Sequence, residues 1–76
     1  MQHDDALAFW VIYKNPKDCP GRYVLRKQYA TREGVVVDKD SFVAIEPQEL
    51  REQMPPGLVK IGPQPGDDPV ILEVWV

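Results

Sequence analysis

The chain has 76 residues, of which 43% are hydrophobic and 28% charged, and its formal net charge at pH 7 is −3. A chain of this length forms one small domain that buries only roughly 60% of its unfolded surface. Few apolar side chains outside the core are then left to line a deep catalytic cavity. We therefore expect a single domain over residues 1–76, with 1–6 as a flexible tail, and a non-enzymatic function rather than elaborate catalysis.

The single cysteine and the N-terminal residues bear on the cellular compartment. Cys19 cannot form an internal disulfide, and the acidic start of the chain lacks the basic residues of a targeting segment. The longest apolar run covers residues 6–13, whereas a membrane-spanning helix needs about 20 residues. We expect a cytoplasmic protein without a membrane span.

Three extended segments are expected in the first half of the chain. Residues 8–14 are β-branched and aromatic, which favours a central strand, and a turn-rich loop leads to a second strand over 22–30. After a turn at 31–34, the apolar segments 35–37 and 42–45 flank a turn-like stretch at 38–41. They are expected to form two short extended pieces, of which the first could be irregular.

One helix is expected in the second half, over residues 47–54. Pro47 suits a first helical position, Glu49 lies near the positive end of the helix dipole, and Leu50 and Met54 repeat at i and i+4. The Pro-Pro-Gly segment at 55–57 ends the helix. Strands are then expected over 58–61 and 70–76, separated by a proline-rich loop at 62–69. This pattern predicts an α+β fold with the order ββ(β)βαββ, a mostly antiparallel four- to five-stranded sheet carrying one short helix on one face.

The expected hairpin assigns residues to the two faces of the sheet. If the first two strands pair symmetrically about their loop, Tyr13 lies opposite Tyr23 and Trp10 opposite Arg26. A short helix covers only part of one face, so the other face would be sealed by its own contacts or covered by a partner. Sealing would have Arg26 stack on Trp10 and pair with Glu73. The alternative is an interaction or regulatory module, which could form a homodimer, with Trp10, Arg26, Glu73 and Trp75 as binding residues.

Two other functions remain open at this point. A small-ligand or minor enzymatic site could lie between the basic hairpin 14–32 and the loop 62–69, with polar lining from Tyr13, Arg22, Arg26 and Asp68, if a concavity of about 300 Å³ exists there. The same hairpin contains six basic side chains and one acidic side chain, and it could bind single-stranded nucleic acid. The overall pI of 4.9 argues against nucleic acid.

Catalytic, metal and cofactor motifs are weak. The thiol of Cys19 and the imidazole of His3 would meet only by accident. Asp38, Asp40 and Glu49 match three calcium-loop positions, but Val43 stands where the loop needs glycine. One cysteine and one histidine do not make a four-ligand zinc site, and a glycine-rich phosphate loop is missing. We expect no catalytic residue, no metal site and no cofactor.

Several short stretches of the sequence, taken in their order along the chain, resemble those of a known group of proteins. They are Trp10-Val11-Ile12-Tyr13, Asp18-x-Pro20, Val24-x-Arg26, Pro55-Pro56-Gly57-Leu58 and Asp67-Asp68-Pro69-x-Ile71-x-Glu73-x-Trp75. Together they resemble a family of very small uncharacterised bacterial proteins over most of the chain. The resemblance implies a whole small bacterial protein and carries no activity, cofactor or catalytic residue with it.

Overall fold

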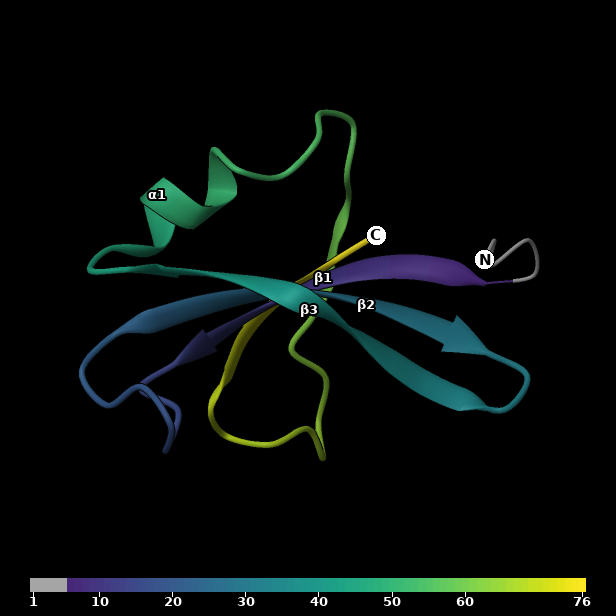
Figure 1. Ribbon diagram of the computed structural model, residues 1–76, viewed down its shortest axis with the longest axis horizontal. Helices are drawn as coiled ribbons and strands as arrows, with labels where there is room; N and C mark the ends of the chain where they lie inside the picture. Colours follow the sequence, from purple (N-terminus) through teal and green to yellow (C-terminus); the bar gives the residue numbers. More distant parts are fainter. Residues whose placement is uncertain (1–5) are drawn as a thin grey trace.

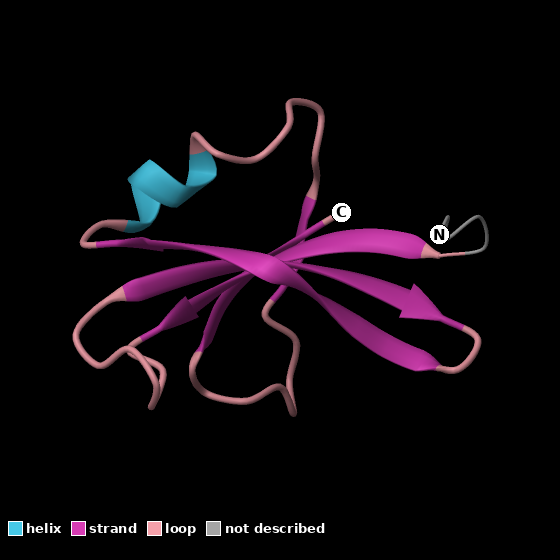
Figure 2. Ribbon diagram, in the orientation of Figure 1, coloured by secondary structure: helices cyan, strands magenta, loops and turns pink. Residues whose placement is uncertain are grey.

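The computed structural model describes residues 6–76, which form a five-stranded antiparallel sheet with one short helix on one side (Figures 1 and 2). The elements are β1 (Leu7–Lys14), β2 (Tyr23–Thr31), β3 (Gly34–Ala44), α1 (Pro47–Arg51), β4 (Lys60–Gly62) and β5 (Ile71–Trp75). The strand order is β3-β2-β1-β5-β4. The predicted α+β class is confirmed.

The β1–β2 hairpin has a register that differs by one residue from the predicted one. Tyr13 lies opposite Val24, and Trp10 lies opposite Lys27 rather than Arg26. The loop places an even number of residues between Asn15 and Arg22, whose backbone groups bond at 2.8 Å. Asn15 itself takes a left-handed conformation with φ 53°. Because side chains alternate along a strand, the one-residue difference moves each predicted cross-strand neighbour to the other face.

β3 is one strand of 11 residues, not two short pieces around a turn. Its pairing with β2 shifts between Arg26 and Gln28, so that the single residue Lys27 lies opposite residues 38–40. The turn-like residues therefore form a bulge inside a continuous strand. Aspartate and serine favour turns, and a bulge likewise interrupts the regular pairing of a strand, which explains the wrong prediction at 38–41.

The helix ends earlier than its apolar spacing indicates. α1 stops at Arg51, and the amides of Gln53 and Met54 then bond to carbonyls three residues back, at 3.0 and 3.2 Å. This tightening is typical of a helix end that approaches a proline pair. The predicted final turn is therefore present as tight turns, and Met54 still packs on the core.

The last two strands are shorter than predicted. β4 is limited to three residues, although Val59 also exchanges two backbone hydrogen bonds with Val76 at 2.8 and 3.0 Å. β5 pairs with β1, and a bulge next to Ile12 places Leu72 with Glu73 on the same side of the sheet. This pairing places β5 between the central strand β1 and the edge strand β4.

The core lies between the sheet and α1. Its buried members are Ile12, Leu25, Ala44 and Leu50, and Trp10, Tyr23, Met54 and Leu72 pack against them. We call this side the helix face; its strand residues include Trp10, Ile12, Leu25 and Lys27. We call the opposite side the helix-free face; its strand residues include Leu7, Phe9, Val11, Tyr13, Val24, Arg26, Gln28, Val35, Val37, Val43, Ile61 and Val74. The loop between β4 and β5 lies on the side away from α1 (Figure 1).

Candidate functional site

The helix-free face exposes more large apolar side chains than the helix face. Five of them are between 46 and 62% exposed, namely Leu7, Val35, Val37, Val43 and Ile61. On the strands of the helix face only Val36 and Phe42 are comparably exposed among the described residues. The asymmetry follows from the single helix, which can cover only one side of a five-stranded sheet. It leaves an apolar face of the kind that marks interaction sites.

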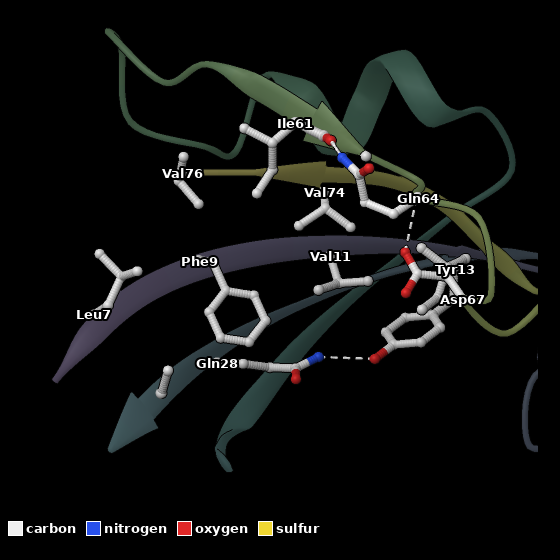
Figure 3. A pocket seen from close by; sticks show the side chains of 13 residues that line it. Leu7, Phe9, Val11, Tyr13, Gln28, Ile61, Gln64, Asp67, Val74 and Val76 are labelled. Atoms are coloured by element: carbon white, nitrogen blue, oxygen red, sulfur yellow. Dashed lines mark hydrogen bonds between the residues drawn. The ribbon is translucent and has the colours of Figure 1, made fainter. Parts of the chain in front are cut away.

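A groove of about 370 Å³ lies within the helix-free face (Figure 3). Its apolar end is formed by Leu7 and Phe9 of β1, Ile61 of β4, and Val76, which follows β5. Its base includes Val11 and Val74, which are paired across β1 and β5. The volume falls at the lower end of the range for small-molecule sites.

The other end of the groove is polar. The side-chain amide of Gln28 donates a 2.7 Å hydrogen bond to the hydroxyl of Tyr13, although Gln28 is a buried strand residue. Asp67 lies above Tyr13 at this end, and one of its oxygens accepts the backbone N–H of Gln64 at 2.8 Å (Figure 3). Asp67 is the one charged side chain in the groove lining of the described chain. The groove therefore combines an apolar end with hydrogen-bond acceptors at the opposite end.

Arg26 lies near this end but belongs to a different set of contacts. Its guanidinium pairs with Asp18 at 2.6 Å and lies 5.4 Å from the centre of the Tyr13 ring. Both contacts come from the loop and strand that precede β2. The charge of Arg26 is therefore balanced within the hairpin itself.

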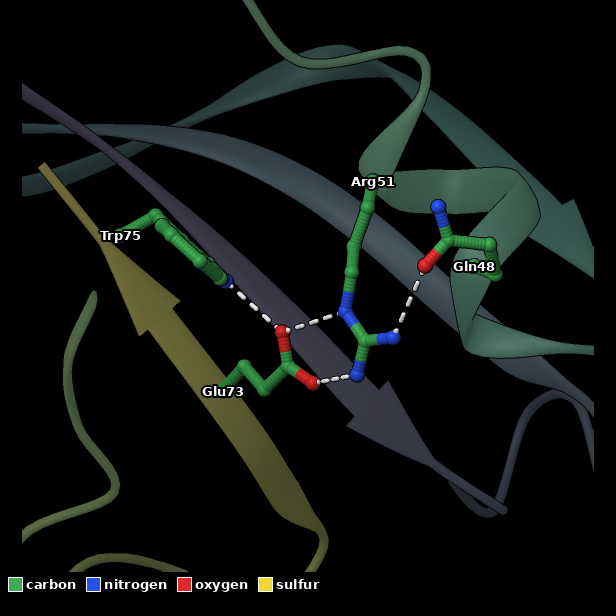
Figure 4. Close-up of polar contacts among 4 residues, drawn as sticks. All are labelled: Gln48, Arg51, Glu73 and Trp75. Carbon is green, nitrogen blue, oxygen red and sulfur yellow. Dashed lines mark hydrogen bonds and ion pairs between the residues drawn. The ribbon is translucent and has the colours of Figure 1, made fainter. Parts of the chain in front are cut away.

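The helix face carries a second polar cluster (Figure 4). The carboxylate of Glu73, buried beneath α1, accepts bonds from both sides of the Arg51 guanidinium, one of them from Nε at 3.1 Å. The indole N–H of Trp75 adds a bond of 2.8 Å to the same carboxylate. The bond to Arg51 lowers the pKa of Glu73, although burial acts in the opposite direction. The cluster joins α1 to β5. Among the described residues, every buried side-chain polar atom has a hydrogen-bond partner.

Trp10 has a cation beside it, but this cation is Lys27. The Lys27 ammonium lies 5.2 Å from the ring centres of both Trp10 and Tyr29. The predicted stacking of Arg26 on Trp10 and its pairing with Glu73 are therefore wrong. Lys27 and Arg51 take these two positions because the register of the hairpin differs by one residue.

The residues predicted to form one binding surface lie on two faces. Trp10, Glu73 and Trp75 share the helix face, while Arg26 lies on the helix-free face. Among the residues predicted for the alternative ligand site, Tyr13 lines the groove, but Arg22 and Asp68 do not. Arg22 bonds to the Gly21 carbonyl, and Asp68 caps the turn before β5.

Sequence reasoning missed Gln28, Gln64 and Asp67 as groove residues. The available signal was a glutamine in the middle of an otherwise alternating strand, since a buried polar side chain needs a partner. Its partner, Tyr13, could be identified only with the correct register. His3, which the sequence disfavours as a catalytic partner of Cys19, lies outside the described range, as do residues 1–5 of the predicted flexible tail.

Comparisons with known proteins add no assignment. No protein-family model, curated protein or solved structure matches this chain. Within residues 6–76, none of the helical structure has the length and apolar character needed to span a membrane. Over the same range, His, Cys, Asp and Glu side chains do not gather in threes in a way that could hold a metal ion.

Proposed function

We propose that this protein is a non-enzymatic interaction module whose helix-free face docks a second copy of the same chain. The supporting observation is the concentration of exposed apolar side chains on that one face, at Leu7, Val35, Val37, Val43 and Ile61. Packing two such faces together buries all five side chains in each copy. The resulting arrangement is a sheet-on-sheet sandwich, in which the inner faces lie ~10 Å apart.

The size of the face is compatible with a dimer. The five strands contain 8, 9, 11, 3 and 5 residues. At ~3.3 Å per residue and ~4.8 Å between strands they span roughly 570 Å² per copy. Two copies would then bury about 1,100 Å², close to the lower limit for stable specific interfaces. A twofold axis lets the same patch serve both copies, as in most homodimers.

The sheet edges are less suited to self-association than the face. The outer strand β3 carries a bulge at Asp38, Lys39 and Asp40, which interrupts its free row of backbone groups with charges. The other edge, β4, has only three residues and is followed by Pro63. Bulges, charges, prolines and short lengths are the features that protect edges from pairing.

The electrostatics of the face also allow two copies to meet. Outside the bulge, Arg26 is the charged strand residue that the described structure places on this face. Its pairing with Asp18 offsets this charge within each copy. Asp67, from the loop between β4 and β5, adds an exposed charge at the groove on this face. A partner copy that leaves Asp67 in contact with solvent at the rim would bury apolar groups without isolating a charge at the centre of the interface.

The experiment compares two neighbouring valines on opposite faces. Val37 is 51% exposed on the helix-free face and Val36 is 43% exposed on the helix face, so Val36→Lys is a matched control for Val37→Lys. Sedimentation equilibrium should show a wild-type dimer whose dissociation constant rises at least about a hundredfold in Val37→Lys, because an unpaired charge is costly inside an interface. Val36→Lys should dimerise like wild type. A wild-type monomer throughout the concentration series, or equal effects of both substitutions, would contradict the proposal.

A further inference from the structure

The groove in the helix-free face has the lining of a ligand site, and its contacts specify a chemical class. We propose that the groove binds a small amphiphile with an apolar chain and a primary amine head group, the amine lying against Asp67 and the hydroxyl of Tyr13. This inference goes beyond self-association, because the whole lining of the groove comes from one chain. In the dimer, the partner copy would lie over the mouth of the groove.

The apolar end selects the chain of the ligand. Phe9, Ile61 and Val76 surround it, and Val11 and Val74 form its base (Figure 3). A volume of about 370 Å³ accepts a short alkyl chain or an aromatic ring, and such walls offer dispersion contacts without hydrogen bonds. The ligand must therefore be apolar along most of its length.

The polar end selects the head group. Tyr13 already accepts the Gln28 amide, so its hydroxyl oxygen has one lone pair left for a second donor. One oxygen of Asp67 accepts the backbone N–H of Gln64, which leaves its other oxygen for a ligand. Two acceptors at the same end of the groove, one of them charged, match an ammonium group, which has three donors and one positive charge (Figure 3).

The same lining disfavours an acid. A ligand carboxylate would face the Asp67 carboxylate, and the described groove lining contains no lysine or arginine. The nearby Arg26 is held by Asp18 and is not part of that lining. The order of affinity should therefore be amine, then alcohol, then carboxylate for ligands with the same chain.

The test uses octylamine, octanol and octanoate, titrated separately below their micellar concentrations into full-length protein with labelled methyl groups. Chemical shift changes should occur at the methyl groups of Val11, Ile61 and Val74, whereas those of the distant Val35 and Val36 should change little. Octylamine should bind about fivefold more tightly than octanol, as expected for a partly exposed ion pair, and octanoate should bind most weakly.

Two neighbouring aspartates provide the variant and its control. Asp67→Asn keeps an oxygen that can accept the backbone N–H of Gln64 but removes the negative charge. Octylamine and octanol should then bind this variant equally. Asp68→Asn removes the same charge next to the groove, where Asp68 only caps Val70, and should leave the wild-type order unchanged. The proposal would be overturned if wild type bound all three probes equally or bound octanoate most tightly. It would also be overturned if chemical shift changes spread over the whole face, or if the two variants had equal effects.

Sedimentation of the same samples separates this proposal from the dimer. A monomeric protein that shows the predicted order of probes would contradict self-association and support the groove site. A wild-type dimer that binds none of the probes, together with a monomeric Val37→Lys variant that also binds none, would contradict the groove site and support self-association.

Discussion

Removing the Arg51 side chain should destabilise the fold in a way that depends on pH. Glu73 has a side chain that is only 4% exposed, and Arg51→Met leaves its carboxylate with the Trp75 indole as its remaining donor. Breaking a fully buried pair costs about 3–5 kcal/mol. The Arg51 side chain is 36% exposed and therefore partly screened, so we expect a loss of about 2–3 kcal/mol in the free energy of unfolding at neutral pH.

The pH dependence follows from the direction of the pKa of Glu73. Arg51 lowers this pKa below its ordinary value of 4.5, so the pair stabilises the wild type above that value and loses its contribution as the pH falls through the folded pKa. Without Arg51, burial raises the pKa of Glu73, and protonation relieves the isolated charge. The difference between the two proteins should therefore shrink as the pH falls from neutral to about pH 4 and below.

Urea unfolding at one fixed protein concentration measures this difference. Arg22→Met is the matched control, because Arg22 is exposed and bonds only to the neighbouring Gly21 carbonyl; it should stay within about 0.5 kcal/mol of wild type. The double variant Arg51→Met/Glu73→Gln should lose the pH-dependent part of the effect. A difference that stays constant between neutral and acid pH would refute the assignment of this energy to the buried carboxylate.

Three further substitutions test other parts of the structure by the same urea assay. Leu50→Ala should cost about 2–5 kcal/mol, because Leu50 is the fully buried residue of α1; a smaller loss would mean that the helix is not docked. Gly62→Ala would place a methyl group 3.0 Å from Val74 and should cost about 1–3 kcal/mol, whereas wild-type stability would contradict the close approach of β4 to β5. Lys27→Met should cost about 0.5–1 kcal/mol through the loss of its contact with Trp10, and a stabilised variant would contradict that contact.

The sequence is sufficient to predict the elements because Gly and Pro separate segments with distinct apolar patterns. β1 and the start of α1 are clear for this reason: one is a β-branched and aromatic run, and the other begins at Pro47. The acidic segment 38–40 is ambiguous, since the same residues suit a turn and a bulge. Only the long pairing of β3 with β2, which is a tertiary property, decides between them.

The candidate site was harder to predict than the fold because it depends on register. A hairpin loop with one residue more or fewer exchanges the two faces, so Arg26 and Lys27 change places relative to Trp10. The conformation of Asn15 sets this loop, and composition alone does not reveal it. The general prediction that one short helix leaves a sheet face uncovered does not depend on register, although the residues on that face do.

Contacts between labelled and unlabelled copies would test the proposed use of this face most directly. In an equal mixture of isotope-labelled and unlabelled protein, filtered nuclear Overhauser spectra report only contacts that cross between chains. The proposed dimer predicts such contacts at the methyl groups of Leu7, Val37 and Val43, which are exposed on the helix-free face. Contacts confined to Val36 and Phe42 on the helix face, or no contacts between chains at millimolar concentration, would contradict it.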